Sequence, residues 1–300
     1  MADPGLRASV VVAVRGDRRV YRLLESLLEQ TAPTGTYEIV VVENGSAVLA
    51  DVGALGDGTV RYLHMPQANM AAARNLGLDA AKGRYVLLTD ADCIASRDWI
   101  EQLTNCLASG SFGAVGGAIG KYQPRSLTQR CGITVVDGQQ RLSYLPALWL
   151  PYVAGANAGF VTAALHEVGG FDEVFKSGND VDICYRLGLY GYAIGLAPRA
   201  VVLHEDRATV RAHFRRFRDY AVYQVLLYAK YKRVSGRSFV VNPYPFTRVS
   251  GALAAAPWAL VRLLRGDTVP VAKLVLQLVE AVGVWWGDAL GSLRFRQLYL

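Results

Sequence analysis

Short apolar runs alternate with helical segments over about the first 110 residues, and this alternation constrains the fold more than any other feature. The runs are rich in β-branched residues and predict strands at residues 9–14, 37–42, 60–64 and 84–89. Apolar residues at helical spacing predict helices at residues 19–30 and 70–81. Alternation of this kind predicts an α/β fold with a mostly parallel central sheet and helices on both faces.

Polar side chains follow three of the predicted strands at the point where each strand ends. Arg15, Glu43 and Asp90 are these residues, and they are far apart in the sequence. In mostly parallel sheets, ligands bind in the crevice outside the carboxyl ends of the strands. The sequence therefore predicts that the three side chains meet in one crevice.

A second carboxylate, Asp92, stands two residues after Asp90, with the small Ala91 between them. Two carboxylates this close repel each other, and a divalent cation relieves the repulsion. Hard oxygen ligands suit Mn²⁺ or Mg²⁺, which proteins hold with one or two carboxylates and the phosphates of a substrate. The alternative is an acidic turn that the dipole of the following helix favours. The position at a strand end favours the metal site.

Four blocks of this sequence resemble family 2 glycosyltransferases, which use the GT-A fold. The blocks fall at residues 9–46, 69–92, 155–173 and 179–187, and together they cover about residues 8–205. Their most distinctive stretches read EIVVVENGS, NMAAARNLG and NDVDICYRL. Each block is common by itself, but their order and spacing are specific to the family.

The resemblance implies a role for several individual residues. Asp92 and His204 would be ligands of the divalent metal, and Asp90 would contact the ribose or a metal-bound water. Glu43 would accept a hydrogen bond from the nucleobase, at a position where the family usually has Asp. Arg74 would lie near the nucleotide.

Two positions in the predicted nucleotide site depart from the family pattern. Ala13 and Arg15 stand where relatives often have Pro and an aromatic residue that packs on the nucleobase. A guanidinium plane can also stack on a base or reach a phosphate. The expected donor nucleotide is UDP, with dTDP and GDP left open by Arg15.

Asp180 is the predicted catalytic base. An acceptor hydroxyl is a poor nucleophile until a base removes its proton, and a carboxylate opposite the leaving diphosphate permits in-line attack with inversion. The family usually has an acidic residue at the position of Asn179, so Asp180 would carry the role alone. The alternative is that Asp180 and Asp182 cap the helix predicted at residues 181–190.

These residues predict an inverting, metal-dependent glycosyltransferase that moves a sugar from a nucleotide-diphosphate donor to an acceptor hydroxyl. The acceptor could be a small molecule, a lipid-linked molecule or a glycan. Asn179 motivates the alternative of a non-catalytic module that binds a nucleotide sugar or carbohydrate. A dinucleotide-binding oxidoreductase is disfavoured because no glycine cluster follows the first strand. No nucleic-acid partner is expected, since no nucleic-acid-binding motif accompanies the basic residues.

The predicted organisation is a catalytic domain at residues 1–206 and a helical region at 207–300. The catalytic domain would consist of a nucleotide-sugar half, to about residue 95, and an acceptor half after it. In the helical region, helices are predicted at residues 209–232, 249–265 and 269–290.

The net charge, the cysteines and the two C-terminal helices indicate which partners and which cellular location to expect. The net charge of +7 suits anionic partners. Cys93, Cys106 and Cys184 fall in segments predicted to be in or near the core, so they are expected to be free buried thiols, which fits the cytoplasm. No apolar run precedes the first strand, so no signal peptide is expected. The uncharged stretch at 249–261 is shorter than a membrane span, and Glu280 interrupts the apolar stretch at 274–286. These helices are expected to pack on the body, with peripheral contact to the inner face of a membrane or a homodimer as the alternatives.

Overall fold

The computed structural model describes residues 5–46, 49, 51–56, 58–110, 112–131, 150–236 and 241–299. These residues form two compact units. Unit 1 holds those up to Tyr122 and from Leu150 to His204, and unit 2 holds 123–131 and those from Glu205 onward. The division after His204 lies beside the boundary expected at residue 206, and unit 2 also takes the short segment that begins at Gln123.

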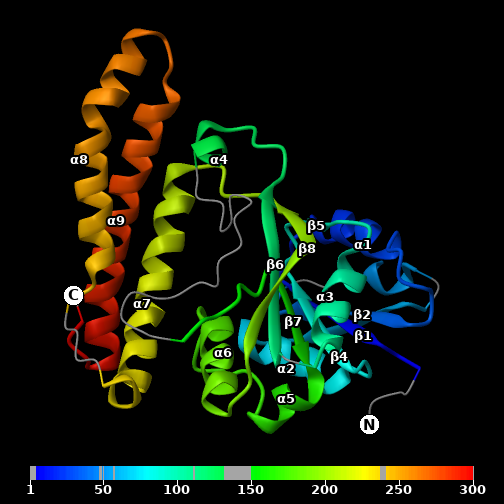
Figure 1. Ribbon diagram of the computed structural model, residues 1–300. Helices are drawn as coiled ribbons and strands as arrows, with labels where there is room; N and C mark the ends of the chain where they lie inside the picture. The colour runs from blue at the N-terminus through cyan, green and yellow to red at the C-terminus, as the bar shows by residue number, and fades with distance from the viewer. Residues whose placement is uncertain are drawn as a thin grey trace. The chain divides into compact units, whose positions relative to one another are not determined.

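Unit 1 is built around one eight-stranded sheet (Figure 1). Its order is β3-β2-β1-β4-β7-β6-β8-β5. The strands are β1 (Ala8–Val14), β2 (Tyr37–Asn44), β3 (Val60–Met65), β4 (Tyr85–Thr89), β5 (Cys93–Ala95), β6 (Ala114–Lys121), β7 (Asn157–Val161) and β8 (Ile194–His204). Strands β3, β2, β1 and β4 are parallel, whereas β7 runs antiparallel to both neighbours. The predicted α/β fold is confirmed, and the two expected halves share this single sheet.

Helices cover both faces of the sheet, so β1 and β2 are buried along their whole length. Val10 and Val12 belong to the core under α1 (Val20–Leu28) and α3 (Trp99–Ala108). Val11 and Ala13 belong to the core on the other face. The helices of that face are α2 (Met70–Ala80), α5 (Thr162–Glu167) and α6 (Asn179–Leu189). A strand buried on both sides must be apolar throughout, which explains the continuous run at 9–14.

The second sequence block owes its pattern to the packing of α2. The Asn69 side chain caps this helix by accepting hydrogen bonds from the backbone N–H groups of Ala71 and Ala72, at 3.0 and 3.3 Å. A Cβ at Gly77 would lie 2.3 Å from Val11 Cγ1, and one at Gly83 would lie 2.4 Å from the backbone of Ala8. Glycine at these two positions lets α2 and the turn into β4 approach β1 closely.

Unit 2 is helical. Its helices are α4 (Leu127–Cys131), α7 (Val210–Ser235), α8 (Pro243–Leu264) and α9 (Val269–Phe295). The predicted C-terminal helical extension is confirmed, but α8 begins six residues earlier than the predicted residue 249. The Asn242 side chain caps it, and Pro243 occupies a first-turn position whose N–H has no helical partner.

Helix α9 is longer than the helix predicted at residues 269–290, and its length bears on whether the protein contacts a membrane. It continues through Glu280 to Phe295, and by length and composition alone it is long enough and apolar enough to cross a membrane. Glu280, which was expected to interrupt the apolar stretch, lies within the helix and does not end it. Of its most apolar window, 33% is buried within the protein.

Candidate active site

Most of the predicted site residues lie at the carboxyl edge of the unit 1 sheet. Val14 pairs with Glu43 in the β1–β2 register, so the strand ends before Arg15 and at Glu43 are neighbours. Strand β4 is parallel to β1 and ends at Thr89, directly before Asp90. Because parallel strands present their carboxyl ends at one edge, residues from distant parts of the sequence come together there.

Asp92 and His204 are brought together by strand pairing. Cys93 lies opposite His204 in the antiparallel β5–β8 pair, and Asp92 Oδ1 lies 3.4 Å from His204 Nε2. Adjacent ligands of an octahedral ion with bonds of about 2.1 Å lie about 3 Å apart, so one cation could contact both atoms after a small adjustment. The donor set of one carboxylate and one imidazole therefore fits a divalent ion.

These two residues would not enclose a metal by themselves. Within the described ranges, no group of three or more His, Cys, Asp or Glu side chains is arranged to hold a metal ion. Divalent ions that act on phosphates commonly have one or two protein ligands, and substrate oxygens and water complete the coordination. The arrangement matches a metal that binds together with a diphosphate.

Arg19 extends this cluster. Its Nη2 atom lies 3.6 Å from Asp92 Oδ2 and 2.6 Å from Asp17 Oδ2. The loop between β1 and α1 thus places a cation on the second oxygen of the metal-ligand candidate. Nearby, burial raises the pKa of the Cys93 thiol, and the negative charges of Asp90 and Asp92 raise it further.

Arg74 connects the Asp90–Asp92 triplet to the start of α6. Its guanidinium is almost fully buried; Nη1 donates to Asn179 Oδ1 at 2.5 Å, and Nη2 lies 3.5 Å from Asp90 Oδ1. The guanidinium also lies over the Phe171 ring, 5.8 Å from its centroid. Gly155 leaves room for it, because a Cβ there would be 2.5 Å from Nη2. Arg74 therefore holds a positive charge in a fixed place beside Asp90. The residue that accepts the hydrogen bond of Arg74 on the other side, Asn179, is a neutral amide rather than an acid.

Asp180 stands at the first turn of α6, beside this guanidinium. Its Oδ2 atom accepts a hydrogen bond of 2.9 Å from the backbone N–H of Gly155, and its side chain is partly exposed. Gly155 therefore positions both Asp180 and Arg74. The N-cap residue of α6 is Gly178, in a left-handed conformation, but Asp180 Oδ1 accepts a hydrogen bond of 3.0 Å from the first-turn N–H of Val181. Asp180 therefore also stabilises the start of this helix, as the capping alternative predicts.

Asp182 has a structural role. It is fully buried, and Arg186 Nε donates to its Oδ2 at 2.9 Å. The same guanidinium donates to the backbone carbonyls of Val168 and Gly170. Two carboxylates two residues apart thus differ in function, since one lies at the site and the other anchors the loop before α6.

Glu43 is fully buried, and its hydrogen bonds are internal. Its Oε1 accepts from Gly16 N at 3.0 Å and from the Ser46 hydroxyl, and the Tyr62 hydroxyl lies 3.5 Å from Oε2. This carboxylate ties the loop after β1 to the end of β2. Arg15 lies on that loop and is exposed.

Ala13 is a predicted site residue whose side chain lies in the core. Its side chain is 8% exposed and packs in the core beside Val11 and Val42. Alternation along β1 turns it into this layer, because neighbouring residues of a strand point to opposite faces. The side chain of Ala13 is thus a core residue, and the place of Ala13 in the nucleotide site stays a prediction.

The sequence analysis gave no site role to Arg19 or Gly155. It treated Asn179 only as a position where the family usually has an acidic residue. Arg19 was assigned to the first helix, although its place just after a strand end was a signal. Gly155 and Asn179 owe their roles to Arg74, which lies about 80 and 105 positions away in the chain. Contacts this distant carry no local pattern.

The fold and the acidic edge of the sheet define a GT-A type protein. The mannosyltransferase PcManGT from Pyrobaculum calidifontis, solved with GDP-Man and Mn²⁺, superposes with a TM-score of 0.65 over 96% of this chain and 89% of its own, at 20% identity. The chain belongs to glycosyl transferase family 2, whose model matches residues 9–169. This match confirms the resemblance that the four blocks indicated.

Two named relatives show how far the sequence similarity extends. The pre-mycofactocin glycosyltransferase of Mycobacterium tuberculosis is 31% identical over 212 residues, which is 68% of this chain and 43% of that protein. The succinoglycan biosynthesis protein ExoA of Rhizobium meliloti is 25% identical over 282 residues, covering 89% of this chain and 80% of its own length. The chain spans less than half the length of the mycobacterial relative.

Proposed function

We propose that this protein transfers a sugar from a nucleotide-diphosphate donor to an acceptor hydroxyl, with inversion and with the help of a divalent cation. One observation carries the proposal: the Arg74 guanidinium contacts Asp90 on one side and Asn179, next to Asp180, on the other. A donor-side acid pair and a candidate base thus belong to one site. Sugar transfer needs both, because the leaving diphosphate gains charge while the acceptor loses a proton.

Asp92 and His204 would hold the cation, Mn²⁺ or Mg²⁺. When bound, such a cation neutralises charge on the leaving diphosphate. The 3.4 Å separation of their ligand atoms supports this assignment, as does the Mn²⁺ in the complex of PcManGT. Arg74 would add a second positive charge beside the diphosphate, and Asp90 would contact the ribose or a metal-bound water.

Asp180 would accept the proton of the attacking hydroxyl. The N–H groups of Gly155 and Val181 each donate to one of its carboxylate oxygens, at 2.9 and 3.0 Å, and so fix the orientation of the carboxylate. A base placed opposite the leaving group removes the proton during in-line attack, and that geometry inverts the sugar. The acceptor would be a small molecule, a lipid-linked molecule or a glycan.

Arg15 would stack on the nucleobase or reach a phosphate from the loop after β1. Its exposure supports the role. The buried hydrogen bonds of Glu43 support a role in shaping that loop, and the predicted contact of Glu43 with the base is kept as part of the proposal. UDP remains the first candidate, with dTDP and GDP next; PcManGT was solved with GDP-Man. A cytoplasmic location, where nucleotide sugars are made, stays part of the proposal.

A panel of nucleotide sugars tests the proposal, with and without Mn²⁺ or Mg²⁺. The expected result is metal-dependent binding of one donor and its slow hydrolysis when no acceptor is present. The competing function is a module that binds nucleotide sugar or carbohydrate without turnover, which Asn179 favours because an acid is missing there. Tight, metal-dependent binding with no hydrolysis and no transfer to any acceptor would establish that alternative.

A further inference from the structure

Helix α8 is too poorly buried for an apolar helix in water. Along its 22 residues only Pro245, Ala252 and Ala259 are buried, and these are spaced seven apart on a single line. Large apolar side chains point away from that line; Leu253, Trp258 and Leu264 are 68%, 60% and 88% exposed. A helix that is apolar on most of its surface is ordinarily surrounded by apolar material.

Helix α9 has two different faces. Gly283, Gly287 and Gly291 lie one turn apart and pack on the α7 backbone; a Cβ at Gly287 would be 2.3 Å from the Arg218 carbonyl oxygen. Exposed apolar side chains also follow the helical spacing along α9: Val275, Leu278, Val282, Trp286 and Leu293. The first three of them line hollows to which Val210 or Phe214 of α7 also contributes. The glycine face of α9 is therefore covered by α7, and a second face of α9 carries a stripe of exposed apolar side chains.

Together α8 and α9 carry most of the large apolar side chains that are exposed in the described residues. Single exposed apolar residues are normal, but a continuous surface of this kind marks a binding site for a protein or a membrane. The helices run antiparallel, joined by the short turn at 265–268, and form the hairpin drawn in orange and red in Figure 1. We call this surface the hairpin face.

Charges on the hairpin favour an anionic partner. Arg265 at the turn and Lys273 at the start of α9 are exposed. The acidic side chains are engaged within unit 2, namely Asp267 with Arg262, Glu280 with His213 and Asp288 with Asn242. Trp258 lies under the Arg262 guanidinium, 5.8 Å from it. Tryptophan beside basic residues is typical of helices at the boundary between lipid and water.

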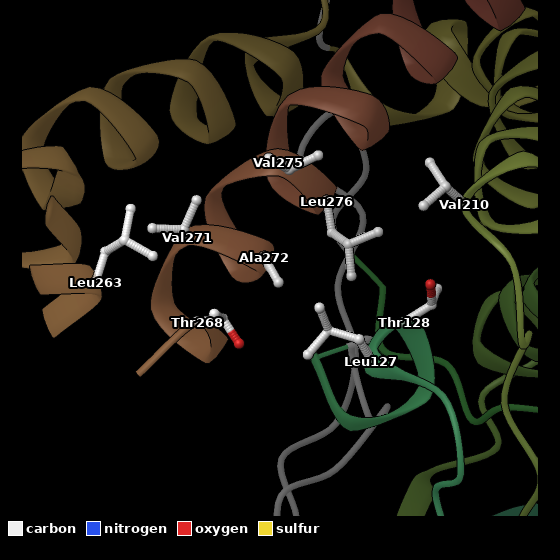
Figure 2. Close-up of a pocket in the computed structure, with 9 residues that line it drawn as sticks. All are labelled: Leu127, Thr128, Val210, Leu263, Thr268, Val271, Ala272, Val275 and Leu276. Atoms are coloured by element: carbon white, nitrogen blue, oxygen red, sulfur yellow. The ribbon is translucent and has the colours of Figure 1, made fainter. Parts of the chain in front are cut away.

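A hollow next to the turn adds a second apolar feature (Figure 2). Its volume is about 310 Å³, and α4, α7, α8 and α9 all contribute to its wall. The lining side chains are aliphatic except for those of two threonines, Thr128 and Thr268. Such a wall suits a hydrocarbon chain and offers nothing to a charged ligand.

We propose that the hairpin face docks on a lipid bilayer with anionic headgroups, with α8 and α9 lying in the interface rather than crossing it. The apolar side chains would enter the headgroup boundary, Arg265 and Lys273 would contact lipid phosphates, and the hollow would accept part of an acyl chain. The polar, arginine-rich α7 packs along α9 and argues against a crossing. A second copy of the chain fits less well, because a two-fold contact would bring these basic side chains toward their own copies.

The test is flotation of the full chain with vesicles of pure phosphatidylcholine and of phosphatidylcholine with phosphatidylglycerol. We expect the chain to float with the anionic vesicles and its tryptophan emission to shift to shorter wavelength. The double variant Trp258→Glu, Leu264→Glu should bind about a hundred-fold more weakly or worse, since two large apolar contacts are lost. Arg265→Gln with Lys273→Gln should weaken binding to anionic vesicles about thirty-fold.

Leu189→Glu is the matched control, because Leu189 is 47% exposed at the end of α6 in unit 1. It should bind vesicles like the parent, and circular dichroism should show all variants folded. A folded parent chain that stays unbound with both vesicle types would overturn the proposal. So would sedimentation showing a dimer that the Trp258 and Leu264 substitutions dissociate, without vesicle binding. Neither readout depends on sugar transfer, so the test is separate from that of the proposed activity.

Discussion

Asp180 and Asp182 are chemically identical, two residues apart on α6, and the structure assigns them to different tasks. Asp180 is partly exposed and is held by the Gly155 N–H group, whereas Asp182 is fully buried against Arg186. Replacing each with Asn removes one charge and almost no volume. The pair of variants therefore separates catalysis from stability within one turn of one helix.

Asp180→Asn should lose activity and keep the fold. The amide oxygen can still accept from one of the two N–H groups of Gly155 and Val181, so one of these hydrogen bonds is lost, and the amide cannot take a proton from the acceptor. Loss of a general base lowers turnover by about 10²–10⁴ fold, which corresponds to about 3–5 kcal/mol in the barrier. Donor affinity should change little, because the residue would act on the acceptor.

Asp182→Asn should lose stability and keep the chemistry. Removing one partner of a buried ion pair costs about 3–5 kcal/mol, because Arg186 would keep its charge without a counter-charge. For a unit of this size that is a fall of about 6–20 °C in melting temperature. The fraction that remains folded should turn over at nearly the parental rate.

The assay combines single-turnover sugar transfer or donor hydrolysis with donor titration and thermal melts on both variants. Parental turnover in Asp180→Asn would refute its role as the base. An unchanged melting temperature in Asp182→Asn would show that the pair with Arg186 does not stabilise unit 1. Loss of turnover in folded Asp182→Asn, with Asp180→Asn active, would reverse the two assignments.

Three further predictions concern the donor site and unit 2. Gly155→Ala should weaken donor binding about ten-fold in calorimetry, because the new methyl group would displace the Arg74 guanidinium and its charge-assisted hydrogen bond; unchanged affinity would contradict this. Chelation of divalent ions should abolish donor turnover, and Asp92→Asn should weaken Mn²⁺ binding in the presence of nucleoside diphosphate; Mn²⁺ affinity equal to the parent's would remove Asp92 from the metal site. Burial raises the pKa of Asp288 to about 7, so the folded protein keeps a proton that the unfolded chain releases from about pH 4 upward. Stability should therefore fall as pH rises from about 4 to about 7, and Asp288→Asn should remove that slope in melts across this range; an unaltered slope would contradict the assignment.

The sequence by itself determined the α/β core and the order of its first strands. Strands buried on both faces are mostly apolar, so the runs at 9–14, 37–42 and 84–89 could be recognised as strands. Asp90 and Asp92 indicated the carboxyl edge of the sheet. The resemblance carried by the four blocks named the family, and the match over residues 9–169 confirmed it. These signals are local or repeat within a few residues, which is why they can be seen without coordinates.

Only the tertiary structure decided which side chains work together. The amide of Asn179 holds Arg74 across 105 positions, and Asp92 meets His204 because β5 pairs with β8. It also decided which way side chains point, since the pleat of β1 turns the Ala13 side chain into the core. In unit 2 it turned the glycines of α9 toward α7 and left the apolar face of α8 outward. Such choices follow from packing between distant segments, where the favourable contact depends on geometry that no short stretch of sequence contains.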